Sequence, residues 1–307
     1  MKFWEGYWKS LKPLEVEEPI DVWVHRPLAY LLARAALPLP VSPNAITMVS
    51  IALGLVSAYA MIAVFPQHLA LAGAALFSSA VFDCADGQLA RLRGTSSAFG
   101  RMLDGVADLV VSTAAVGGGT YILFREFDPP HWRGALAVAL ALCTIITGSF
   151  HTSSYDHYKN VFLRLTHAKY QEGESYEQAK RRFDELRPTL SLIVRGCWSI
   201  YLFYVKSQTD YIRRFDPITA ELSRLPTYTE ERASIYRKHA GGLMRIWRGW
   251  FGFGSLVFGM SVTIGLGVVE YYMAFRLLLL NLVFYGYLRP RQRRASEAAF
   301  REMGVAT

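Results

Sequence analysis

Residues 82–108 read FDCADGQLARLRGTSSAFGRMLDGVAD, and this stretch decides how the rest of the chain is interpreted. It contains four aspartates, Asp83, Asp86, Asp104 and Asp108. The aspartates lie among apolar residues in runs that are long enough to enter a membrane. A carboxylate is costly in that setting unless a positive charge is bound beside it. The remaining sequence is therefore interpreted as a scaffold for a charged site.

The spacing of the aspartates predicts two helical faces. Asp83 and Asp86 are three residues apart, and Asp104 and Asp108 are four apart. Both spacings place a pair on one face of a helix. Residues 94–97 predict a turn between the pairs, which would make the two helices antiparallel neighbours. All four carboxylates can then converge on one site near the turn.

Such a site predicts metal ions and a phosphorylated substrate. Four carboxylates this close repel one another, and divalent cations offset that repulsion. Because the ligands are all oxygens, Mg²⁺ or Mn²⁺ is expected, as two ions. The neighbouring Arg91 indicates a phosphate or diphosphate, whose charge two metal ions can neutralise. One remaining carboxylate can act as general base on an attacking hydroxyl.

The composition of the chain is that of a membrane protein with basic loops. Its 307 residues are 52% hydrophobic and carry a formal net charge of +8. The basic residues flank apolar runs, which favours membrane lipids or a phosphorylated substrate over nucleic acid as partner. The three cysteines are far apart and odd in number, which argues against a disulfide framework or a zinc site.

Apolar runs predict six membrane spans, each able to cross a hydrocarbon core of about 30 Å. Ser42 or Asn44 can cap the first of them. Residues 189–205 have the length of a span, but Arg195 lies at their centre. This segment is therefore interpreted as interfacial or packed within a larger insert. The six predicted spans lie at about residues 44–65, 68–93, 98–124, 134–155, 247–268 and 271–288.

The distribution of basic residues predicts the orientation. Of the 33 Lys and Arg residues, 17 lie between Lys159 and Arg248, and a further cluster lies in the C-terminal tail. The loops near residues 66–68 and 125–132 carry little positive charge. The positive-inside rule then places both termini and the motif turn in the cytosol. We expect an inner (cytoplasmic) membrane protein whose active site opens at the cytosolic face.

The predicted fold class is an all-α, polytopic membrane protein with six transmembrane helices. A helix over about residues 19–37 has the amphipathic pattern of an interfacial helix, and a soluble helix packed on the insert is the alternative. The five expected segments are an N-terminal interfacial segment (1–40), spans one to four with the aspartates (41–159), a helical cytosolic insert (160–242), spans five and six (243–290) and a cytosolic tail (291–307).

The motif resembles the signature of the CDP-alcohol phosphotransferase family at every fixed position. It reads Asp83-x2-Asp86-Gly87-x2-Ala90-Arg91-x8-Gly100-x3-Asp104-x3-Asp108. Eight fixed positions with fixed gaps leave little room for chance, and the six-span prediction agrees with that family's fold. The resemblance covers about residues 40–160 and, loosely, the last two spans. It leaves residues 160–242 unexplained.

The resemblance implies a reaction in which a CDP-linked donor loses CMP as an acceptor hydroxyl attacks the phosphorus distal to cytidine. It also implies homodimers, which are common in the family. Metal would be bound by Asp83, Asp86 and Asp104, with Asp108 as general base and second-metal ligand. The nucleotide site would be formed by Gly87, Ala90, Arg91, Gly100, Asn44 and Thr47.

The acceptor and the donor stay open at this point. The acceptor pocket is expected at the cytosolic end of the fourth span, where the candidates are His151, Tyr155 and Lys159. The alternative is that these are interfacial aromatics and a snorkelling lysine. CDP-diacylglycerol is the favoured donor because compact six-span members usually use it. The alternative is CDP-choline or CDP-ethanolamine with diacylglycerol as the acceptor.

Two other classes of protein are weaker interpretations. Intramembrane carboxylates also occur in ion pathways, so a divalent-cation transporter is one alternative. It leaves Arg91 and the glycines of the motif without a role. A catalytically silent scaffold is the other, and the intact set of four aspartates argues against it.

Overall fold

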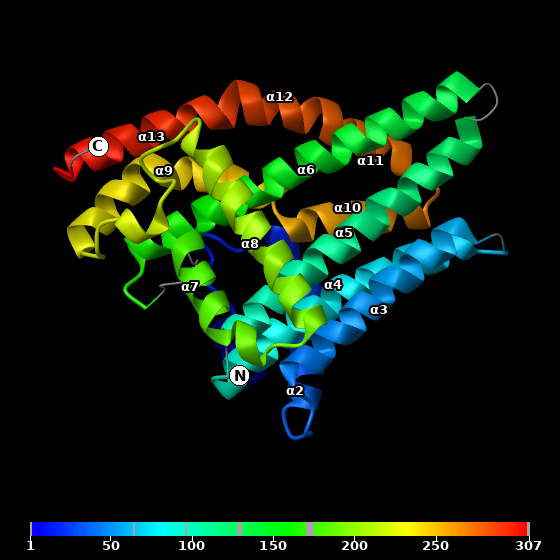
Figure 1. The fold of residues 1–307 in the computed structure, drawn as a ribbon, viewed down its shortest axis with the longest axis horizontal. Helices are drawn as coiled ribbons and strands as arrows, with labels where there is room; N and C mark the ends of the chain where they lie inside the picture. The colour runs from blue at the N-terminus through cyan, green and yellow to red at the C-terminus, as the bar shows by residue number, and fades with distance from the viewer. Residues whose placement is uncertain (1, 64, 96, 128–130, 170–174, 306–307) are drawn as a thin grey trace. The chain divides into compact units, whose positions relative to one another are not determined.

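The computed structural model describes residues 2–63, 65–95, 97–127, 131–169 and 175–305. Within these residues the regular secondary structure is entirely helical (Figure 1). This confirms the predicted all-α class. The chain divides into two compact units, residues 1–149 with 253–280 and residues 150–252 with 281–307. The five segments expected from hydropathy stay a prediction about membrane topology.

The first unit contains the motif and the apolar helices that precede it. Its elements are α1 (Lys2–Ser10), the π-helical turn η1 (Asp21–His25), α2 (Arg26–Ala36), α3 (Pro43–Ile62), α4 (His68–Arg93), α5 (Ala98–Phe127), the first part of α6 (His131–Thr166), α10 (Phe253–Gly265), α11 (Val269–Phe275) and η4 (Arg276–Leu280). Helix α3 packs against both α4 and α5, and α10 packs against α4.

The second unit contains most of the predicted insert and the C-terminal helix. Its elements are the rest of α6, α7 (Tyr176–Leu186), η2 (Arg187–Thr189), α8 (Leu192–Arg213), η3 (Leu222–Arg224), α9 (Glu230–Trp250), α12 (Asn281–Val283), η5 (Phe284–Leu288) and α13 (Arg289–Glu302). Helix α9 packs against α13. The predicted helical character of the insert is therefore confirmed.

Among the described residues, five helical stretches are long and apolar enough to cross a membrane, which confirms a polytopic membrane fold. They are Pro43–Ile62, His68–Arg93, Met102–Arg125, Trp132–Thr166 and Val269–Glu302. Five of the six predicted spans therefore have a matching helix. The span predicted at about residues 247–268 does not, because α9 ends at Trp250 and α10 has only 13 residues.

A carboxylate from the N-terminal segment explains why a new helix starts at this point. Glu18 is 5% exposed and accepts hydrogen bonds from the backbone N–H groups of Gly254 (3.0 Å) and Ser255 (2.8 Å). These two amides belong to the first turn of α10, where a helix has no carbonyl partner of its own. A single helix over residues 247–268 was therefore wrong, since its cap comes from a distant part of the chain.

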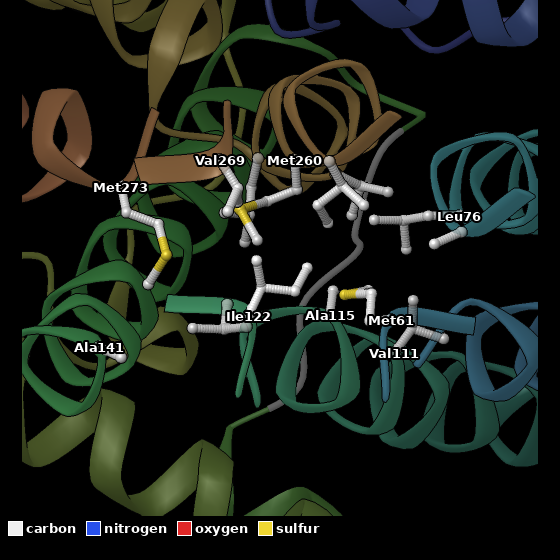
Figure 2. Close-up of a cluster of buried hydrophobic side chains, with 14 of the residues drawn as sticks. Met61, Leu76, Val111, Ala115, Ile122, Ala141, Met260, Val269 and Met273 are labelled. Carbon is white, nitrogen blue, oxygen red and sulfur yellow. The ribbon is translucent and has the colours of Figure 1, made fainter. Parts of the chain in front are cut away.

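Small residues bring α4 and α10 close together beside the apolar core of the first unit. Figure 2 shows part of this core, in which Met61, Leu76 and Met260 are buried. At Gly73 of α4, a Cβ atom would lie 2.8 Å from the Cα and N atoms of Gly265 in α10. Any side chain at residue 73 therefore requires backbone to move, because both neighbouring atoms belong to the main chain.

We expect Gly73→Ala to destabilise the first unit by about 1–3 kcal/mol, the usual effect of overpacking. The measurement is the melting temperature of the purified protein in detergent. Gly117→Ala in α5 is the matched control, because a Cβ atom there meets nothing within 4 Å. Equal melting temperatures for the two variants would contradict the close approach of α4 to α10.

Candidate active site

The four aspartates lie on two helices joined by a tight turn. Asp83 and Asp86 are on α4, and Asp104 and Asp108 are on α5. Gly94 ends α4 with a φ of 65°, a left-handed conformation that glycine adopts at little cost. Beyond the turn, the N–H of Gly100 donates to Ser97 Oγ (2.9 Å) and so caps the start of α5. The chain therefore reverses between the two pairs of aspartates.

Three of the four carboxylates meet at one point. One ligand oxygen from each of Asp83, Asp86 and Asp104 lies within 4.8 Å of the other two. Asp86 is only 6% exposed. Three carboxylate oxygens at this separation fit a hard divalent cation such as Mg²⁺ or Mn²⁺. The resemblance implied these three residues as metal ligands together with Asp108, which is not part of this group of three.

Asp108 lies beside this three-aspartate cluster. Together with Asp83 it lines a small hollow, which also receives Phe253 and Val257 from α10. Asp108 is one helical turn beyond Asp104 on α5, so the two carboxylates come from the same side of that helix. The hollow has both polar and apolar walls, and the general-base role of Asp108 stays a prediction.

The first span contributes directly to the cluster. Ser42 Oγ accepts from the N–H of Ala45 (3.2 Å) and caps α3, which is one of the two predicted caps. One turn further along α3, the buried Thr47 hydroxyl donates to Oδ2 of Asp86. Such a bond fixes the orientation of a metal-binding carboxylate. The sequence suggested that Thr47 contacts nucleotide, and it did not indicate this contact with Asp86.

The other nucleotide-site candidates surround the same end of the first unit. The Oδ1 atom of Asn44 lies 3.6 Å from the point that a Cβ on Gly100 would occupy. A Cβ on Gly87 would lie 3.4 Å from Nη1 of Arg91, so the guanidinium lies next to Gly87. Ala90 is partly buried on α4 next to Arg91. A nucleotide-binding role for these residues stays a prediction.

The three candidate acceptor residues lie on α6 in the second unit. His151 is fully buried and shares a hydrogen bond between its Nε2 atom and Oδ1 of Asn281 (3.0 Å). The ammonium of Lys159 lies 2.6 Å from Asp156 Oδ1 and 5.4 Å from the centroid of the Tyr155 ring. The bond of His151 joins α6 to α12, whereas the contacts of Lys159 lie within α6. An acceptor-binding role for the three residues stays a prediction.

The sequence analysis did not predict two serines, Ser50 and Ser79, that lie near the aspartates. Ser50 Oγ donates to the carbonyl of Ser79 (2.9 Å), and Ser79 Oγ donates to the carbonyl of Ser50 (2.8 Å). Both residues line the hollow with Asp83 and Asp108. Ser50 is three residues after Thr47, so helical spacing could have placed both on one polar face of the first span. The reciprocal bonds tie α3 to α4 at the level of the hollow.

Comparison with known proteins agrees with this geometry. Residues 40–162 match the family model described as CDP-alcohol phosphatidyltransferase. The phosphatidylinositol phosphate synthase of Corynebacterium glutamicum is 32% identical over 114 residues, which cover 37% of this chain and 50% of that protein. The protein of the same name from Mycobacteroides abscessus is 35% identical over 124 residues, which cover 40% of this chain and 51% of that protein.

The chain thus spans about half the length of the curated relatives that it matches. The matched region includes all eight motif positions, the capped start of α3 and the α4–α5 turn. It also includes the three carboxylates that meet within 4.8 Å of one another. Through these residues, residues 40–162 of the chain are similar to the CDP-alcohol phosphatidyltransferase family.

Proposed function

We propose that this protein moves a substituted phosphoryl group from a CDP-linked donor to an alcohol hydroxyl and releases CMP. The observation that carries the proposal is the meeting of Asp83, Asp86 and Asp104 from two helices of a membrane fold. The match of residues 40–162 to the CDP-alcohol phosphatidyltransferase family model supports the reaction class, a transferase of substituted phosphate groups. The proposed product is a phospholipid or a phospholipid precursor.

In the proposed reaction, the protein's residues hold the donor and move one proton. Divalent cations held by Asp83, Asp86 and Asp104 would neutralise the diphosphate and stabilise the leaving oxygen of CMP. Arg91 adds positive charge beside the diphosphate. The hydroxyl oxygen of the acceptor attacks the phosphorus distal to cytidine, and Asp108 accepts the proton of this hydroxyl. The P–O bond to CMP breaks, and CMP leaves with the bonding electrons.

The relatives support a phosphatidyl group as the part that is transferred. Both are named phosphatidylinositol phosphate synthases, and their product therefore contains a phosphatidyl group. By similarity we propose CDP-diacylglycerol as the donor and place inositol phosphate first among the acceptors to be tested. A CDP-aminoalcohol donor with diacylglycerol as acceptor is the second candidate, because the motif itself is compatible with both.

Orientation and assembly are part of the same proposal. The clustering of basic residues between Lys159 and Arg248 supports a cytosolic active site and cytosolic termini. Candidate spans support an integral location, which we propose to be the cytoplasmic membrane. A homodimer is proposed from the family resemblance alone.

The direct test is CMP release by purified protein with Mg²⁺. We expect release from CDP-diacylglycerol with at least one water-soluble alcohol of a panel that contains inositol phosphate, glycerol phosphate and serine. The controls are reactions without acceptor and reactions with chelator. Release only from CDP-choline or CDP-ethanolamine with diacylglycerol would contradict the preferred donor. Divalent-cation flux into liposomes without CMP release would instead favour a transporter.

A further inference from the structure

Hydrogen bonds join the N-terminal helix α1 to the motif helix α4 at Ser10. The Nε–H group of Arg91 donates to the backbone carbonyl of Ser10 (2.7 Å). The side-chain amide of Gln88 donates to Ser10 Oγ (3.1 Å), and Ser10 Oγ donates in turn to the carbonyl of Tyr7 (2.6 Å). Gln88 and Arg91 are three residues apart and so lie on one face of α4. This face binds both the hydroxyl and the backbone carbonyl of Ser10.

Buried contacts of Tyr7 and Leu11 fix the end of α1 at which Ser10 contacts α4. Tyr7 is 1% exposed, its hydroxyl donates to the carbonyl of Val22, and its ring lies 5.7 Å from the ring of Tyr30. Burial raises the pKa of Tyr7 to about 12, so the hydroxyl stays protonated and keeps its bond. Leu11 joins the same buried cluster. The buried neighbours Tyr7 and Leu11 therefore fix the position of Ser10.

The contact with Ser10 constrains a residue of the nucleotide site. A guanidinium is planar, so fixing its Nε–H group restricts the plane in which the two terminal nitrogens lie. One of these nitrogens, Nη1, lies next to Gly87, 3.4 Å from the point that a Cβ on this residue would occupy. The charge of Arg91 also acts on Asp86, a member of the three-aspartate cluster. The guanidinium therefore extends from Ser10 towards the proposed site of the diphosphate.

We propose that Ser10 is a positioning residue that holds Arg91 in the orientation required to bind the diphosphate of the CDP donor. Gln88 in turn holds Ser10. This inference rests on the proposed function, because it needs a diphosphate at the aspartate cluster. It assigns to the N-terminal segment, which lies outside the matched residues 40–162, a part in binding the donor.

The test combines two variants with a change of Arg91 itself. Ser10→Ala removes the hydroxyl between Gln88 and Tyr7, and Gln88→Met removes the amide at similar length. Neither variant removes the bond from Arg91 to the backbone carbonyl of Ser10, but each removes a bond that fixes the position of this carbonyl. Each is therefore expected to raise the KM for CDP-diacylglycerol about three- to tenfold while kcat changes little. In an Arg91→Lys background neither variant should raise KM further, because residues that act through one another are not additive.

Lys9→Ala is the matched control, since Lys9 is on the same helix and pairs only at the exposed surface with Glu5. We expect its KM to equal that of the unaltered protein. Unchanged KM values for Ser10→Ala and Gln88→Met would overturn the positioning role. So would losses that add fully to that of Arg91→Lys, because they would indicate a structural role. An unaltered protein that binds no CDP and releases no CMP would overturn the proposed function as well.

Discussion

Asp108→Asn is expected to lower the rate of CMP release by about a thousandfold, the scale of a lost general base. Asparagine has nearly the same shape as aspartate but cannot take the proton of the attacking hydroxyl. Asp108 lies outside the cluster of three carboxylates that meet within 4.8 Å. We therefore expect metal-dependent CDP binding to be largely kept. Single-turnover CMP release and calorimetric titration with CDP measure the two properties separately.

Asp184→Asn is the matched control for this substitution. Asp184 is an exposed carboxylate on α7 that pairs with Lys180, so its loss should change neither turnover nor CDP binding. Parallel loss of turnover and CDP binding in Asp108→Asn would contradict a base role. It would show that Asp108 acts mainly as a ligand or a structural residue.

Asp86→Asn is expected to give the opposite pattern and to weaken binding itself. Asp86 is a buried member of the cluster and accepts a hydrogen bond from Thr47. Removing its charge leaves two carboxylates, and we expect metal affinity to fall by about 100-fold or more, beyond the loss typical of an outer partner. The measurement is the Mg²⁺ dependence of CDP binding. Chelation of the unaltered protein should abolish CDP binding, and added Mg²⁺ should restore it.

Thr47→Val tests the same site with a smaller change, because it leaves the charge of Asp86 in place. It keeps the shape of the side chain and removes only the hydroxyl that orients Asp86, so metal affinity should fall by about tenfold. A graded series, with Asp86→Asn worse than Thr47→Val, is the expected result. If Asp86→Asn kept the Mg²⁺ requirement of the unaltered protein, the three-aspartate cluster would not be the metal site.

The aspartate site was predictable because its spacing is local. Positions three or four residues apart share a helical face whatever the rest of the chain does. Gly94 marked the turn between the two helices, since glycine readily adopts the left-handed conformation found there. Hydropathy also located five of the six expected spans, for which length and apolar content are sufficient signals.

What sequence reasoning missed depends on contacts between distant residues. The start of α10 is capped by Glu18, which is 236 positions before Gly254, and no local pattern reports such a partner. The hydrogen bond from Thr47 to Asp86 joins two helices in the same way. The burial of Tyr7 was not expected either, because residues 1–40 were interpreted as an interfacial segment. Tyr7 in fact belongs to a buried cluster.

The order in which the chain is synthesised matters for the hollow beside Asp83 and Asp108. The first unit breaks off at residue 149 and resumes at 253. Phe253 and Val257, which line the hollow, therefore emerge from the ribosome only after residues 150–252 of the second unit. Until then, the hollow lacks the side chains of Phe253 and Val257. Glu18 likewise lacks the backbone amides that it binds at the start of α10. The hollow beside Asp83 and Asp108 is therefore completed only when α10 is synthesised, after α3, α4 and α5 have already been made.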